Sequence, residues 1–88
     1  MLIGVVIGNV WATKKEDALM GLKLMVVQLE DMVNPDRRES FVAVDRVGAG
    51  IGERVLVVTG SSARQAVADS TTPVDAAIVG ILDEPKAD

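Results

Sequence analysis

The segment Val47-Gly48-Ala49-Gly50-Ile51-Gly52-Glu53 runs directly into Arg54-Val55-Leu56-Val57-Val58-Thr59. Its glycines recur at every second position and leave one side of the backbone bare, so that another backbone can approach closely. The run that follows has the length and the β-branched content of a strand. A dinucleotide-binding loop would need a glycine in place of Glu53 and a helix in place of this strand. The segment therefore predicts a structural packing loop of an oligomer rather than a cofactor site.

The composition argues against most catalytic and metal-binding chemistry. The 88 residues suit one small domain, and 49% of them are hydrophobic although Trp11 and Phe41 are the only aromatic residues. Because the chain has neither cysteine nor histidine, it lacks thiolate metal ligands and the commonest general base. A formal net charge of −4 disfavours binding to phosphate backbones. We therefore expect a structural protein with no catalytic residue, cofactor, metal or nucleic-acid partner.

Five short runs rich in Val, Ile and Leu predict strands. Their ranges are Leu2–Trp11, Leu22–Leu29, Phe41–Val47, Arg54–Thr59 and Ala76–Asp83. Gly60-Ser61-Ser62 offers a helix N-cap ahead of Ala63–Ala68, which suits one or two helical turns. The simplest architecture is all-β, a small five-stranded OB-like β-barrel with one short helix. We assign residues 1–84 to this single barrel domain and residues 85–88 to a flexible C-terminal tail.

The first run, Leu2–Trp11, could be taken for a targeting segment. It has no basic region ahead of it, is interrupted by Gly4, Gly8 and Asn9, and is too short to cross a bilayer. A buried first strand explains it better, so we expect a cytoplasmic protein without a membrane partner.

Three predicted strands carry apolar residues on both faces. In the first, Ile3, Val5 and Ile7 alternate with further apolar or glycine positions, and the fourth and fifth strands follow the same pattern. One face fills the barrel, and in so short a chain the simplest cover for the other is a second copy. We therefore predict a homo-oligomeric ring whose strands meet neighbouring chains at Gly4, Val6, Gly8, Val79 and Ile81.

Several other groups have both a functional and a structural interpretation. The segment Thr59–Arg64 could hold an anion through free backbone N–H groups at a helix start, but an ordinary cap with Arg64 in an ion pair is the simpler interpretation. Trp11 fits a plug at a barrel end or an interface anchor. Four scattered carboxylates lack metal-loop spacing and fit strand ends or ion pairs better; they are Asp45, Glu53, Asp75 and Asp83.

Ordered motifs along nearly the whole chain carry a family resemblance. They are Gly8–Lys14, Gly21–Leu24, Val42–Asp45, Val47–Glu53, Gly60–Arg64 and Val74–Ile81. Together they resemble the bacterial microcompartment vertex proteins, the pentameric shell proteins of carboxysomes and of ethanolamine-type metabolosomes. The loop Asp31–Ser40 and the tail depart from the family pattern. The general likeness favours a metabolosome over a carboxysome.

The resemblance implies a structural protein that caps shell vertices as a five-fold ring. Its partners would be copies of itself and the hexameric shell proteins of the same compartment. The resemblance also places two segments near the ring axis or at subunit contacts, without deciding which lines the axis: Gly48, Ala49, Gly50, Ile51, Gly52 and Glu53, and Gly60, Ser61, Ser62 and Arg64. An OB-like module that binds single-stranded nucleic acid or a small anionic ligand is the alternative.

Overall fold

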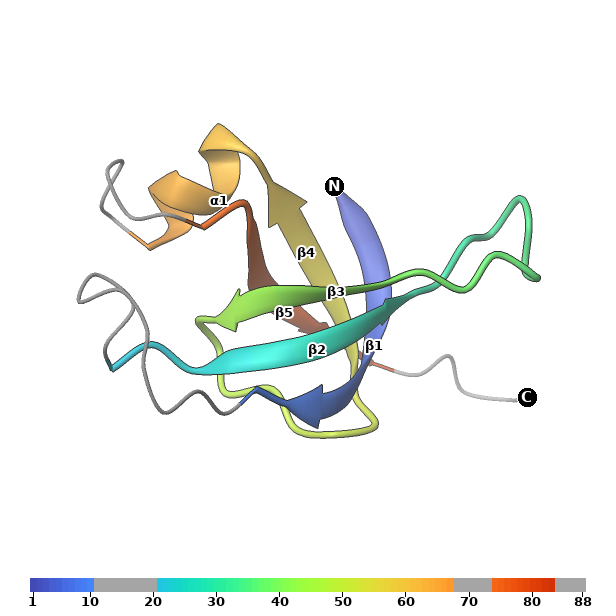
Figure 1. Ribbon diagram of the computed structural model, residues 1–88, viewed down its shortest axis with the longest axis horizontal. Helices are drawn as coiled ribbons and strands as arrows, with labels where there is room; N and C mark the ends of the chain where they lie inside the picture. Colours follow the sequence, from blue (N-terminus) through green and yellow to red (C-terminus); the bar gives the residue numbers. More distant parts are fainter. Residues whose placement is uncertain (11–20, 68–73, 84–88) are drawn as a thin grey trace.

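The computed structural model describes residues 1–10, 21–67 and 74–83, which fold into a closed barrel (Figure 1). The strands close in the order β1-β2-β3-β5-β4, and all neighbouring pairs are antiparallel except β3 and β5. The predicted five-stranded barrel with one short helix is confirmed. Its elements are β1 (Leu2–Asn9), β2 (Leu24–Leu29), β3 (Ser40–Asp45), β4 (Arg54–Thr59), α1 (Ser61–Ala66) and β5 (Ala76–Leu82).

Several element boundaries differ from the prediction. The strand β3 ends at Asp45 instead of Val47, because the Asp45 carboxylate accepts hydrogen bonds from the N–H groups of Val47 and Gly48, both at 3.0 Å, and turns the chain. The first strand ends at Asn9, two residues before the predicted end. The predicted tail, residues 85–88, lies outside the described residues.

The helix α1 begins two residues earlier than predicted and has no side-chain cap. Gly60 occupies the cap position at φ 63°, a left-handed conformation that lets β4 turn directly into the helix. Ser61 and Ser62 are therefore the first helical residues, and within the predicted cap segment Gly60-Ser61-Ser62 the N-cap is Gly60.

The barrel interior is filled by small and medium aliphatic side chains. The main core consists of Val6, Met25, Val27, Ala43, Ala49, Val55, Val57, Ala76 and Ile78. Burial of this apolar surface is the main force that holds the barrel closed. Val6 and Ala49 are each 0% exposed in the single chain, so they have no surface left for a partner. The predictions of Val6 as an interface residue and of Ala49 as a contact residue are therefore wrong.

The bare backbone at Gly4 serves the barrel itself. A Cβ atom placed on Gly4 would lie 2.5 Å from Val27 Cγ1 and 2.7 Å from the Gln28 carbonyl oxygen. The close approach permitted by this glycine is thus between β1 and β2 of one chain, and its predicted place in an interface between subunits stays a prediction.

The helix α1 covers one part of the outer face of the barrel. It packs against β4 and β5 and buries its residue Ala63. Ala77 lies between the core residues Ala76 and Ile78 and so points outward, yet it is 0% exposed. The short helix therefore hides the outer face near the end of β4, while other parts of that face have no cover among the described residues.

Candidate assembly surfaces

A first apolar row crosses the uncovered outer face of β1, β4 and β5. Ile3 pairs with Leu56, which in turn pairs with Gly80. A Cβ atom on Gly80 would lie 3.6 Å from Leu56 Cβ, so the glycine keeps this row flat. An apolar and flat strip of sheet suits contact with a second sheet.

A second apolar row crosses β1, β2 and β3. Gly8 pairs with Val26, and Val26 pairs with Val42, which is 46% exposed. Nothing lies within 4 Å of a Cβ atom placed on Gly8, so the surface above it is open. The neighbouring Ile7, at the β1 bulge, is 47% exposed. The two rows extend from β1 in opposite directions around the barrel.

A more polar row separates the two apolar rows. It contains Val5 on β1, flanked in register by Gln28 on β2 and Arg54 on β4. The guanidinium group of Arg54 donates to both carboxylate oxygens of Glu30, at 3.0 and 3.2 Å. This bidentate ion pair links the end of β2 to the start of β4.

The glycine loop, residues 46–53, connects β3 to β4 and is fixed by Asp45. The Asp45 side chain is only 1% exposed and lies 3.3 Å from Lys23 Nζ, which also donates to the Ala49 carbonyl oxygen at 3.2 Å. Burial opposes ionisation of the Asp45 carboxyl, but backbone N–H groups, with Val47 first, and the Lys23 ammonium outweigh it. The Asp45 pKa is therefore lowered.

The far half of the glycine loop is a tight turn bonded to β1. The Glu53 N–H donates to the Gly50 carbonyl, and the Glu53 carboxylate accepts from the Gly50 N–H at 2.6 Å. Gly52, at φ 91°, adopts the left-handed conformation that this turn requires, and its N–H donates to the Val6 carbonyl at 2.8 Å. The loop thereby presents Ile51, which is 63% exposed, in a fixed position.

The two predicted contact segments do not form one site within a subunit. The glycine loop precedes β4, whereas α1 follows β4 at its other end (Figure 1). Arg64 on α1 donates to the Val74 carbonyl oxygen at 3.4 Å. With only one turn and a half of helix, α1 is too short to form an anion site at its N-terminus.

The remaining candidates have structural roles or fall outside the description. Asp45 and Glu53 accept hydrogen bonds within the glycine loop, and in residues 1–10, 21–67 and 74–83 no three His, Cys, Asp or Glu side chains could together hold a metal ion. Trp11 lies outside the described residues. In the described part of the chain, the helix is far shorter and less apolar than a membrane span requires. Contact roles for Gly8, Val79 and Ile81 stay predictions.

The sequence also matches a family model described as "Ethanolamine utilisation protein EutN/carboxysome" over residues 1–83. The chain belongs to the EutN/CcmL family. Its relatives include the microcompartment shell vertex protein EutN of Escherichia coli K12, which is 46% identical over 85 residues that span 96% of this chain and 88% of EutN. The carboxysome shell vertex protein CcmL of Gloeobacter violaceus is 41% identical over 88 residues, 100% of this chain and 88% of CcmL.

Solved structures of the EutN/CcmL family share the barrel. GrpN, a pentameric microcompartment shell protein from Rhodospirillum rubrum, gives a TM-score of 0.81 at 46% identity and covers 99% of each chain. The structure of Gloeobacter violaceus CcmL gives a TM-score of 0.86 at 41% identity, over 100% of this chain and 91% of CcmL. Family membership confirms the predicted resemblance and, with it, the prediction of a structural microcompartment shell protein rather than an enzyme or an OB-like binding module.

Proposed function

We propose that five copies of this chain form a ring through the two apolar rows and that the ring closes a shell vertex between hexameric shell proteins. The observation that supports the ring is the pair of rows that the described residues leave uncovered, Ile3–Leu56–Gly80 and Gly8–Val26–Val42. In a cyclic assembly each subunit uses two different patches, one for each neighbour. The pentameric state of GrpN sets the expected number of copies at five.

The compartment and the partners follow from the same role. A flat layer of hexagonal tiles needs five-fold units to close, so hexameric shell proteins are the partners at the outer edge of the ring. The net charge of −4 makes the ring a poor ligand for nucleic acid. A metabolosome is the proposed compartment, and the enzymes encoded beside this chain would test that assignment.

Two substitutions on one face of β3 test the role of the second row. Val42 and Ser40 both point outward, and each pairs with an outward residue of β2. Native mass spectrometry should find five chains for the wild type and for Ser40→Glu, but single chains for Val42→Glu. A stable interface buries roughly 800 Å² per partner and tolerates no unpaired charge at its centre. A five-chain Val42→Glu ring would exclude the second row, and a monomeric wild type would contradict the ring itself.

A further inference from the structure

The connection between β2 and β3, residues 30–39, projects from one end of the barrel, and we name it the finger (Figure 1). Two neighbouring apolar side chains on the finger are exposed, Met32 at 77% and Val33 at 94%, and we call this pair its tip. Neither belongs to the apolar rows described above. Adjacent apolar side chains held in solvent on a projecting loop are typical of a contact surface.

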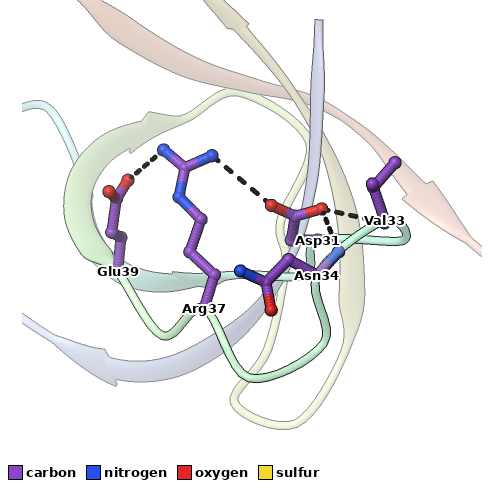
Figure 2. A network of polar contacts seen from close by, with 5 residues as sticks. All are labelled: Asp31, Val33, Asn34, Arg37 and Glu39. Atoms are coloured by element: carbon purple, nitrogen blue, oxygen red, sulfur yellow. Dashed lines mark hydrogen bonds and ion pairs between the residues drawn. The ribbon is translucent and has the colours of Figure 1, made fainter.

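A local polar network fixes the shape of the finger (Figure 2). One oxygen of Asp31 accepts from the N–H groups of Val33 and Asn34, at 2.9 and 3.0 Å. Arg37 bridges the other Asp31 oxygen, at 3.4 Å, and Glu39, at 2.9 Å. The tip is therefore held in place before any partner arrives, and docking it costs little conformational entropy.

A groove of about 550 Å³ lies between the finger and the outer face of the barrel. Its apolar lining comes from Val5 on β1, Leu29 on β2, and Met32 and Pro35 on the finger. A second hollow of about 310 Å³, which shares Leu29 and Met32 with the groove, reaches Ile3. Ile3 opens the first apolar row, so the finger surface is continuous with one of the two surfaces assigned to ring contacts.

We propose that the finger and its groove bind the neighbouring subunit, so that each chain of the ring clasps the next. This inference rests on the proposed ring. Continuity with the first apolar row identifies the occupant as a second copy. Permanent interfaces are also more apolar than transient ones. Two exposed apolar side chains therefore fit contact with a permanent partner, such as the next subunit of the ring. Glu30 and Asp31 at the base of the finger are already paired within the chain, with Arg54 and Arg37 respectively, while Arg38 also lines the groove.

The absence of cysteine from the chain makes single thiols clean probes of this contact. We would compare Val33→Cys with Asp36→Cys, a matched control on the exposed part of the same loop. In the intact ring, the Val33→Cys thiol should react with a maleimide about tenfold more slowly than in the monomeric Val42→Glu background, because a docked tip is shielded from solvent. The Asp36→Cys thiol should react equally fast in both backgrounds.

Four outcomes decide the inference. Slow labelling at residue 33 in the ring, together with an increase of about tenfold in the dissociation constant of the ring for Val33→Asp, supports the clasp. Equal labelling rates at residue 33 in the ring and in the monomer overturn it while the ring stands. Protection that appears only after hexameric shell protein is added also overturns it, because the finger would then contact the tiles. A wild-type chain that never forms rings overturns the ring and the clasp together.

Discussion

The finger and the glycine loop are built around the same local motif, but they differ in what lies behind it. In each, one aspartate oxygen accepts hydrogen bonds from the N–H groups two and three residues further on, Asp31 in the finger and Asp45 in the glycine loop. The Asp45 side chain is 1% exposed, whereas that of Asp31 is 17% exposed. The same kind of turn thus anchors the glycine loop to the barrel at Asp45 and stabilises the projecting finger at Asp31.

The attachments of the two loops follow from this difference. The glycine loop inserts Ala49 into the core and donates its Gly52 N–H to β1, so it cannot move unless the barrel opens. The finger has its own polar network and a hydrogen bond from Leu29 N–H to the Glu39 carbonyl at 2.7 Å. Segments with few buried apolar contacts open locally at a lower free energy than the core, so the finger should open more readily than the glycine loop although its polar network sets its resting shape.

The largest effect is expected when the two aspartates are removed in turn. Asp45→Ala removes the buried carboxylate that accepts from the Val47 and Gly48 N–H groups and pairs with Lys23, so it should lower the free energy of unfolding by about 2 kcal/mol. Asp31→Ala should leave the unfolding midpoint nearly unchanged, because water replaces the lost acceptor. Urea denaturation in the Val42→Glu background measures both without the contribution of assembly. Equal losses would show that the two turns do not differ as the burial indicates.

Acid should separate the same two groups. The pKa of Asp45 is lowered from 3.8 in the folded chain, so the stability contributed by its ionised form is complete above about pH 4. That stability is lost as the pH falls through the lower, folded-state pKa. Asp45→Asn should therefore weaken the dependence of the unfolding midpoint on pH below 4.

Asp31 provides the control for this titration. Hydrogen bonds from the Asn34 and Val33 N–H groups lower its pKa as well, but the group is open to solvent and salt. The Asp31→Asn variant should therefore lose less of the wild-type pH dependence than Asp45→Asn does. If the unfolding midpoint of Asp45→Asn kept the wild-type pH dependence and that of Asp31→Asn lost it, Asp31 rather than Asp45 would be the aspartate whose ionisation stabilises the fold.

The barrel could be predicted from the sequence, because the five apolar runs fall close to the five strands. The sequence does not, however, distinguish the inner face from the outer face where both are apolar. Bulges add to this difficulty: the register of β1 shifts between Val6 and Gly8, and that of β5 skips Val79 opposite Leu56 and Val57. Alternation read along β1 therefore placed Val6 on the wrong face.

The two loops show which polar contacts the sequence can reveal. The Asp31 network lies within nine residues, and Asn34-Pro35-Asp36 marks its turn, so a local pattern was available for part of it. The ion pair of Asp45 depends on Lys23, which is remote in sequence and comes close only because β2 pairs with β3. Contacts between residues remote in sequence follow from the register of strand pairing, and a single sequence does not determine that register here.

The smallest effect is expected from Arg37→Lys in the finger. Arg37 is 49% exposed and bridges Asp31 and Glu39, and exposed ion pairs contribute little to global stability. The unfolding midpoint of the monomeric background should therefore not change. Because the bridge holds only the tip, amide hydrogen exchange at Val33 and Asn34 should accelerate by roughly twofold to fivefold, while exchange at Gly48 stays constant. If exchange at Gly48 rose together with that at Val33, the two loops would open as one unit. The finger would then share the stability of the barrel core and would not be an independently stabilised loop.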